Sequence, residues 1–344
     1  MAIGLVAGFA CSGHWSPRAA LPGFGEDVWP GYRFRADHLA ADIATRYPPD
    51  SHEAKLAFRV TFPLLVRLCG IDRAGLPWWF LSCAIASVLL AAIASSRQGE
   101  AAAETPAWAC LAFVSLPAWS CIVAPSTGFA DGLAACCGLA VLACGNGAAA
   151  ALAAFIALWT DERAALTLAC IAILWTAGRP VSSWPAATWS LGAAGFAYAV
   201  SRLVAATTMG WTTAVAGVNL ENLALKGEWT QLAIWNGGQA LWGVPVLMLL
   251  AHRSSRLWQV CLAVLLAGGV VGSFLVADVT RSLNYLWPLW LAPWLSRGVA
   301  ASLAQFDPTA WWRRGLVALA LLEPNFEVVQ HLIRLIAPQW HTWL

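Results

Sequence analysis

The sequence predicts an all-α protein: a polytopic transmembrane bundle of about ten helices, with an extracytoplasmic first loop that carries amphipathic interfacial helices. Three observations favour this class. Of the 344 residues, 60% are hydrophobic and 11% are charged, whereas about a quarter of the residues in an ordinary soluble domain are charged. Apolar windows alternate with short polar turns. Many of the 22 tryptophans stand at the ends of these windows, where an indole ring suits the level of the lipid headgroups.

The chain divides into three parts. Residues 1–12 are apolar and carry no leading positive charge, and they are shorter than the ~20 residues that cross a bilayer. We therefore expect a truncated N-terminal hydrophobic segment there. Residues 13–74 form the longest polar stretch and are expected to be the extracytoplasmic loop. Residues 75–344 are expected to form the transmembrane helix bundle.

Two amphipathic stretches are expected within the first loop. Residues 33–46 have the pattern of an amphipathic helix. Residues 54–70 space Lys55, Arg59 and Arg67 against apolar side chains, which is more typical of a helix at the membrane interface than of a span. Such arginines either steer an anionic headgroup or anchor the helix. A spanning helix at 54–70 stays as the alternative, and it would invert every later orientation.

The apolar windows of the bundle predict its helices. Several windows are shorter than a simple span, so we expect neighbouring helices to shield them. The windows are 75–96, 107–124, 128–144, 148–159, 164–178, 186–206, 235–252, 257–277, 283–296 and 312–322.

Lysine and arginine in short loops set the orientation, because cytoplasmic loops carry an excess of these residues. Placing residues 13–74 outside puts most of the later basic residues on the cytoplasmic side, among them Arg97, Arg179 and Arg297. The same orientation gathers most of the eighteen acidic residues on the outer face. A charge at membrane depth costs about 2.5–3.5 kcal/mol, so carboxylates persist mainly where they pair or line a wet cavity. We therefore expect the functional site at the outer face.

Three loops bring candidate ligand-binding residues to that face: S-T-G-F-A-D-G, T-D-E-R and A-D-V-T-R-S-L-N-Y. Two of them place an arginine close to an acid, an arrangement that can hold a phosphate or a sugar between a donor and an acceptor. The alternative is a set of helix caps and structural ion pairs. The substrate-binding candidates from these loops are Asp131, Asp161, Glu162, Arg163, Asp278, Arg281 and Tyr285.

The catalytic candidates, Asp27 and Glu26, lie in a turn of the first loop that is rich in glycine and proline. A carboxylate there can act as general base for an acceptor hydroxyl, although an exposed loop pair explains the same residues. Asp37 and His38, on the first amphipathic stretch, are further substrate-binding candidates. A solvated helix face is the simpler interpretation of that pair.

Several function classes are disfavoured. The net charge is +2 without a long basic run, so nucleic acid is not expected as a partner. No C-x-x-C, H-E-x-x-H or phosphate-binding-loop motif occurs, and the six histidines are scattered, so no metal-ligand set is predicted. The ten cysteines lie mostly inside apolar windows, as small hydrophobes.

The order of these features resembles the GT-C class of membrane glycosyltransferases and its uncharacterised bacterial relatives. Members of this class use a polyprenyl-phosphate-linked sugar as donor. The likeness is architectural and extends over about residues 20–300. The pieces that carry it are G-E-D-V-W, the amphipathic stretches with F-R-V-T-F-P-L-L, the short helices around T-D-E-R, and A-D-V-T-R-S-L-N-Y-L-W-P.

The resemblance implies transfer of a sugar from a polyprenyl-phosphate donor to a lipid or glycan acceptor, on the outer face of a bacterial inner membrane. It implies that Asp27 or Glu26 takes the catalytic acidic position. It also implies that arginines such as Arg59, Arg163 or Arg281 meet the lipid phosphate. No D-x-D pair for a metal is present, so no cofactor is assigned and a divalent cation stays open.

Two other function classes remain as alternatives. A transporter or lipid flippase would have its site near the bilayer midplane between two related halves, whereas here the acids gather at one face and no internal repeat is evident. A non-catalytic subunit would use its many alanines and glycines for close approach to a membrane-protein partner. A single cavity lined by Asp27, Asp131, Asp161 and Asp278 would favour the enzyme.

Overall fold

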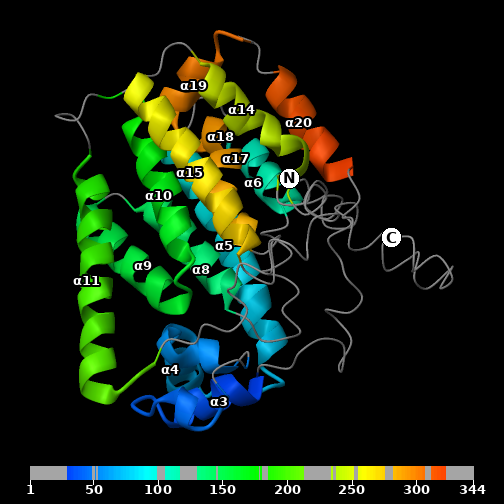
Figure 1. The fold of residues 1–344 in the computed structure, drawn as a ribbon. Helices are drawn as coiled ribbons and strands as arrows, with labels where there is room; N and C mark the ends of the chain where they lie inside the picture. The colour runs from blue at the N-terminus through cyan, green and yellow to red at the C-terminus, as the bar shows by residue number, and fades with distance from the viewer. Residues whose placement is uncertain are drawn as a thin grey trace, which may run out of the picture.

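The computed structural model is all-helical and has no β-strand in the part of the chain that it describes (Figure 1). The all-α prediction is confirmed for that part. The described residues are 29–48, 51, 53–98, 105–116, 130–144, 146–177, 179, 185–212, 234, 238–251, 255–275, 282–306 and 311–322.

The helices vary widely in length. The α-helices of the described ranges are α3 (Trp29–Asp37), α4 (Thr61–Cys69), α5 (Leu76–Gln98), α6 (Thr105–Ser115), α8 (Asp131–Ala143), α9 (Gly147–Thr160), α10 (Ala164–Thr176), α11 (Ala186–Met209), α14 (Gly243–Leu250), α15 (Arg256–Phe274), α17 (Trp287–Trp290), α18 (Ala292–Leu295), α19 (Arg297–Leu303) and α20 (Trp311–Leu322). The short 3₁₀ helices are η1 (Ile43–Thr45), η2 (Glu53–Phe58), η4 (Gln239–Trp242) and η5 (Asn284–Leu286).

The bundle is built around α8. This helix packs against α5 on one side and α9 on the other, and α9 packs in turn against α11. In Figure 1, α15 crosses in front of α5, and it contacts α10 and α14. The core is made largely of leucine and alanine, with Trp287 and Trp290 fully buried among them. Small side chains let the helix axes approach closely.

Two helices of the described part are long and apolar enough to cross a membrane: Leu76–Arg97 and Arg256–Phe274. Shorter apolar helices of 10–17 residues accompany them. A helix of 13 residues, such as α8 or α10, is about 20 Å long against a hydrocarbon core of about 30 Å. The expectation of about ten spans is therefore not confirmed.

The two long helices expose apolar side chains on their outer faces. On α5 they include Leu81, Ile85, Leu89 and Ile93, which recur every four residues. A continuous apolar stripe on a long helix is costly in water and suits contact with lipid or with another protein. On α15 the large exposed apolar side chains are Leu257, Val260, Val264 and Val271.

The window 283–296 was expected to be one helix, but the structure divides it into η5, α17 and α18. Pro288 and Pro293 each stand in the first turn of a new helix, where the missing N–H of proline has no intrahelical partner to lose. Between them, Leu291 leaves the helical conformation, with φ −92° and ψ 1°. Two prolines therefore restart the helix twice within this buried segment.

The two amphipathic stretches of the first loop are also shorter than expected. The helix expected over 33–46 ends at Asp37 and is followed by a turn and η1. The stretch 54–70 divides into η2 and α4, with Arg59 and Val60 between them. With nine residues, α4 is about 14 Å long and too short to cross a bilayer.

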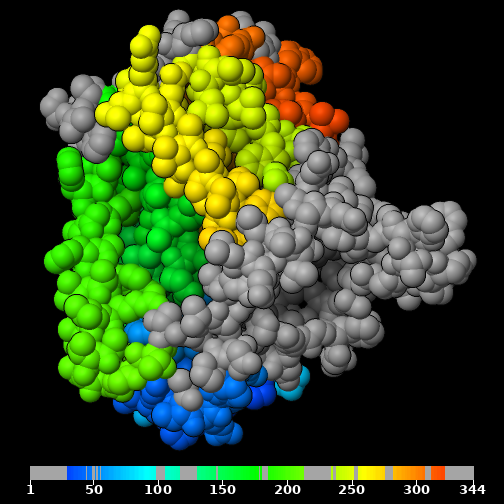
Figure 2. Space-filling view, viewed as in Figure 1, coloured from blue at the N-terminus to red at the C-terminus, as the bar shows by residue number. Residues whose placement is uncertain are grey.

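The described residues between 29 and 69, here called the N-terminal cap, lie across one end of the bundle. The cap closes the lower end of the molecule in Figures 1 and 2. A second hydrophobic core joins it to the bundle: Tyr32 and Phe62 of the cap pack with Phe80 of α5 and with Trp211, just after α11. The cap is therefore fixed to the bundle by apolar contacts as well as by the polar contacts described below.

Arg35 holds the cap together from inside. Its guanidinium donates hydrogen bonds to the carbonyls of Ala41 and Ala57 and lies 4.0 Å from the centre of the Trp211 ring. Burial lowers the pKa of Arg35 to about 10, against an opposing effect of Asp42. Trp211 also donates its indole N–H to the Ala40 carbonyl, at 3.0 Å. One cation thus links three parts of the cap to the end of α11.

Substitutions of two helical glycines test the packing around α8. A Cβ on Gly138 would lie 3.0 Å from Thr167 Cγ2 and 3.2 Å from Trp287 Cζ2, whereas Gly192 on α11 has nothing within 4 Å. We expect Gly138→Val to cost about 1–3 kcal/mol of stability through overpacking and Gly192→Val to cost little. Thermal unfolding in detergent, followed by tryptophan fluorescence, measures both. Equal melting temperatures would contradict this packing.

Candidate functional site

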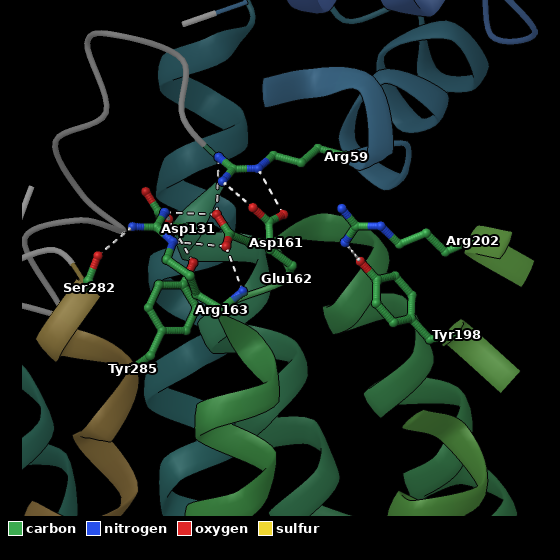
Figure 3. A network of polar contacts seen from close by, with 9 residues as sticks. All are labelled: Arg59, Asp131, Asp161, Glu162, Arg163, Tyr198, Arg202, Ser282 and Tyr285. Atoms are coloured by element: carbon green, nitrogen blue, oxygen red, sulfur yellow. Dashed lines mark hydrogen bonds and ion pairs between the residues drawn. The ribbon is translucent and has the colours of Figure 1, made fainter. Parts of the chain in front are cut away.

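The candidate site lies where three helix ends meet beneath the N-terminal cap (Figure 3). Asp131 is the first residue of α8, Asp161 follows the last residue of α9, and Arg163 directly precedes α10. The turn between α9 and α10 is only three residues long, which keeps the end of α9 and the start of α10 side by side. Asp131 reaches the same point because α8 packs against α9 and α10.

Arg163 is the centre of a buried polar network. Its Nε and Nη2 donate to the two carboxylate oxygens of Asp161, at 2.9 and 2.8 Å, a bidentate arrangement that is strong and directional. Nη2 also donates to Asp131 Oδ1 at 2.8 Å, and Nη1 donates to Ser282 Oγ at 3.3 Å. All three nitrogens of this guanidinium are therefore used by protein oxygens.

Arg59 reaches the same network from the N-terminal cap. Its Nη1 lies 3.2 Å from Asp161 Oδ2, and its Nη2 donates to Glu162 Oε1 at 3.2 Å. The backbone around it is also docked: the N–H of Val60 donates to the Trp159 carbonyl at 2.9 Å. Arg59 therefore connects the cap to the turn between α9 and α10, although it is 103 residues away from Glu162 in sequence.

Tyr285 completes the network on its opposite side. Its hydroxyl donates to Asp131 Oδ1 at 2.7 Å, and Arg163 lies 4.9 Å from the centre of its ring. The hydroxyl of Thr167, on α10, donates to the Tyr285 carbonyl at 2.8 Å. The network thus ties four segments together: the cap, α8, the α9–α10 turn and η5.

The arginines of the network stay charged. Burial alone would lower the pKa of Arg59, but Asp161 and then Glu162 more than offset this, so its pKa is raised. For Arg163, burial again acts downward, and Asp161, Tyr285 and Asp131 together raise its pKa well above the usual value. Asp161 serves both guanidiniums while being 2% exposed. The buried charges are therefore neutralised by one another.

Glu162 is the accessible carboxylate of the network. Its side chain is 41% exposed, against 8% for Asp131 and 2% for Asp161. Figure 3 shows Tyr198 and Arg202 of α11 standing beside this edge. Arg202 donates to the Tyr198 hydroxyl at 2.9 Å. An incoming polar ligand would meet Glu162 first, with Arg59 behind it.

The structure brings together six of the residues that the sequence singled out. They are Arg59, Asp131, Asp161, Glu162, Arg163 and Tyr285. Four others, Glu26, Asp27, Asp278 and Arg281, lie outside the described residues. A shared cavity containing Asp27 and Asp278 therefore stays a prediction.

Asp37 and His38 have local partners instead. Asp37 forms an exposed ion pair with Arg33, one helical turn away, at 3.2 Å. His38 stacks on Phe34 with the ring centres 4.5 Å apart, and its Nδ1 lies 3.0 Å from the Phe34 carbonyl. Both side chains belong to the exposed surface of the cap.

Three members of the site were missed at the sequence level: Tyr198, Arg202 and Ser282. Arg202 is the single charged residue in the 24 residues of α11, and Tyr198 precedes it by one helical turn. A lone arginine inside an apolar helix is costly unless it is paired, so this position could have been found. Nothing in the sequence distinguishes Ser282 from the other polar residues of its loop.

A metal has no evident place among the described residues, where no group of three or more His, Cys, Asp or Glu side chains could hold one. Comparisons with protein-family models, with curated proteins and with solved structures gave no match to this chain. Inferences about function therefore depend on the chemistry of the residues at this site.

Neutralising Asp161 tests how the network is held. Asp161→Asn keeps the shape of the side chain but leaves two buried guanidiniums without the carboxylate that they share. We expect a loss of about 3–5 kcal/mol of stability, the usual cost of breaking a buried ion pair. Asp37→Asn, which breaks an exposed i,i+4 pair, is the matched control and should cost at most about 0.5 kcal/mol.

Chemical denaturation of the two purified variants, in the same detergent as the unsubstituted chain, gives the comparison. A loss at Asp161 no larger than that at Asp37 would mean that water already reaches the network.

Proposed function

We propose that this chain is a multi-pass protein of a bacterial inner membrane that transfers a sugar from a polyprenyl-phosphate donor to a lipid or glycan acceptor. The reaction would take place on the extracytoplasmic face, beneath the N-terminal cap. The observation that carries the proposal is the half-exposed Glu162 carboxylate at the edge of a buried acid–arginine network. The resemblance to GT-C enzymes in the order of the sequence features supports the same reaction.

Sugar transfer makes two chemical demands. The bond from the acceptor oxygen to the anomeric carbon forms while the bond from that carbon to the lipid phosphate breaks. The acceptor proton passes to a base, for which a carboxylate is suited, and the charge that develops on the departing phosphate is stabilised by cations. A site in which an accessible carboxylate, Glu162, lies beside the guanidinium of Arg59 has the two kinds of group that these demands call for.

Different residues would serve these demands in different ways. The general base would be Asp27 or Glu26, as the resemblance implies. Glu162 would accept hydrogen bonds from hydroxyls of the sugar or the acceptor. All three nitrogens of Arg59 also contact carboxylates, so Arg59 would meet the phosphate by exchanging its contacts with the exposed Glu162. Arg163 uses every nitrogen for buried protein oxygens, so its role would be to position the other residues.

A non-catalytic membrane subunit is the second candidate. Arg163, Asp161 and Asp131 satisfy one another's charges and hydrogen bonds. This favours the subunit, because such an ion network needs no ligand to be stable. The network would then serve only to attach the N-terminal cap to the bundle. Turnover measurements separate the two functions.

Turnover of a polyprenyl-phosphate-linked sugar by the purified chain in lipid nanodiscs is the direct test. We expect Glu162→Gln to lower kcat/KM by about 10–100-fold, because an amide cannot replace the charge of a carboxylate. Asp27→Asn should lower kcat more severely if Asp27 is the base. Arg33→Gln changes an exposed residue of the cap and should retain full turnover.

No turnover by the unsubstituted chain across a panel of polyprenyl-phosphate sugars would favour the non-catalytic subunit. Equal turnover in Glu162→Gln and Arg33→Gln would remove Glu162 from the site.

The orientation of the cap can be measured with a native thiol. Cys69, at the end of α4, is free and exposed. Cys261, the other exposed thiol of the described residues, is first replaced by serine. We expect a membrane-impermeant maleimide to label Cys69 in intact spheroplasts, because the cap is proposed to face outward, and a further Cys69→Ser change should remove that labelling. In the background without both thiols, Arg256→Cys at the start of α15 should be labelled only after permeabilisation. The reverse pattern would place the cap in the cytoplasm.

A further inference from the structure

The end of the bundle opposite the cap contains a second polar feature, a cavity of about 300 Å³. Among the described residues, its lining includes Cys144, which directly follows α8, and Leu174, Trp175 and Ala177 at the end of α10. These two helices carry the acid–arginine network at their other ends. Each has 13 residues, so about 20 Å separates the cavity from the candidate site.

Three arginines from distant parts of the chain converge on this cavity: Arg97 at the end of α5, Arg179 just after α10, and Arg297 at the start of α19. All three residues are exposed. The described lining contains no aspartate or glutamate. The cavity therefore concentrates positive charge, in contrast to the network, where carboxylates outnumber arginines.

The backbone adds to the same polarity. Pro185 and Ala187 line the cavity, so the cavity lies at the start of α11, a helix of 24 residues without an acidic residue in its first turn and without a side-chain cap. The free N–H groups of a first turn carry positive partial charge and favour anions. Beside the three arginines, this helix end is a further group that favours an anion.

The arginine-bearing walls are preorganised. Arg97 Nη1 donates to the carbonyl of Ala143 at the end of α8, which fixes one side of its guanidinium. Ser296 Oγ donates to the Leu174 carbonyl at 2.9 Å. A Cβ on Gly298 would lie 2.5 Å from the Ala177 carbonyl oxygen, so α19 approaches the end of α10 as closely as only glycine permits. Binding of a ligand would therefore cost little conformational entropy in these walls.

We propose that this cavity binds a phosphate-bearing ligand through Arg97, Arg179 and Arg297. Guanidinium groups suit phosphate because their N–H groups pair with its oxygens in a planar, bidentate arrangement. A volume of about 300 Å³ is at the lower end for small-molecule sites, which fits a phosphate or diphosphate group better than a large cofactor. The ligand is either a soluble phosphate compound or the headgroup of an anionic lipid, and the site is independent of the sugar transfer proposed above.

Binding of inorganic pyrophosphate to the purified full chain in detergent tests the soluble source. Isothermal titration should show saturable binding that weakens as salt is raised, since exposed charges are screened. Arg97→Gln, Arg179→Gln and Arg297→Gln should each weaken binding at least about tenfold, the loss of roughly one charge-assisted hydrogen bond. Arg256→Gln is the matched control: it removes an exposed arginine at the same end of the bundle that does not line the cavity, and it should bind like the unsubstituted chain.

The lipid source is tested in nanodiscs that contain either zwitterionic lipid alone or added phosphatidic acid. If a headgroup occupies the cavity, phosphatidic acid should compete with pyrophosphate, and native mass spectrometry should show retained phosphatidic acid that is lost in Arg179→Gln and kept in Arg256→Gln.

The proposal is overturned by either of two results. One is that neither pyrophosphate nor phosphatidic acid binds saturably; the other is that Arg179→Gln and Arg256→Gln behave alike in both assays. Equal melting temperatures of the two variants ensure that a difference in binding is not a difference in folding.

Discussion

The sharing of one buried carboxylate by two arginines is the constraint on which the arrangement of this molecule depends. Asp161 lies between Arg59 of the N-terminal cap and Arg163 of the bundle. Removing three charges from water is costly, and only close pairing repays that cost. The pairing also fixes geometry, because the bidentate contact orients Arg163 toward Asp131, and Asp131 in turn accepts from Tyr285. The cap, α8 and η5 are thus positioned through one turn between two helices.

The two ends of the central helices differ in chemical character. At one end, three carboxylates enclose two guanidiniums beneath the cap. At the other end, Arg97, Arg179 and Arg297 surround an open cavity without a described acidic residue. The helices α8 and α10, each about 20 Å long, join the two ends. In the bilayer proposed for this chain, with a hydrocarbon core of about 30 Å, they would be too short to keep both ends outside the core. Such short helices could then carry polar groups at their ends only where these groups are paired or face an open cavity, because unpaired charges at membrane depth are costly.

Much of the fold could be predicted from the sequence because the signals are local. The windows at 75–96, 128–144, 148–159, 164–178 and 257–277 match α5, α8, α9, α10 and α15 within a few residues. The prediction of a single helix over 283–296 was wrong, because a hydropathy pattern does not show where the two prolines begin new helices. The helix expected over 33–46 was wrong in its second half, because the chain turns after Asp37 and the carbonyl of Ala41, in the turn before η1, accepts a hydrogen bond from Arg35.

Sequence alone determined that this chain is helical and strongly apolar, and that its few charges gather in a small number of turns, because composition and periodicity are properties of neighbouring residues. Only the tertiary structure decided which charges pair. Arg59 and Glu162 are 103 residues apart, and nothing local in either segment specifies the other. It also decided that Asp161 is buried while its neighbour Glu162 stays half exposed, since that difference depends on which way each side chain points once the cap lies on the bundle.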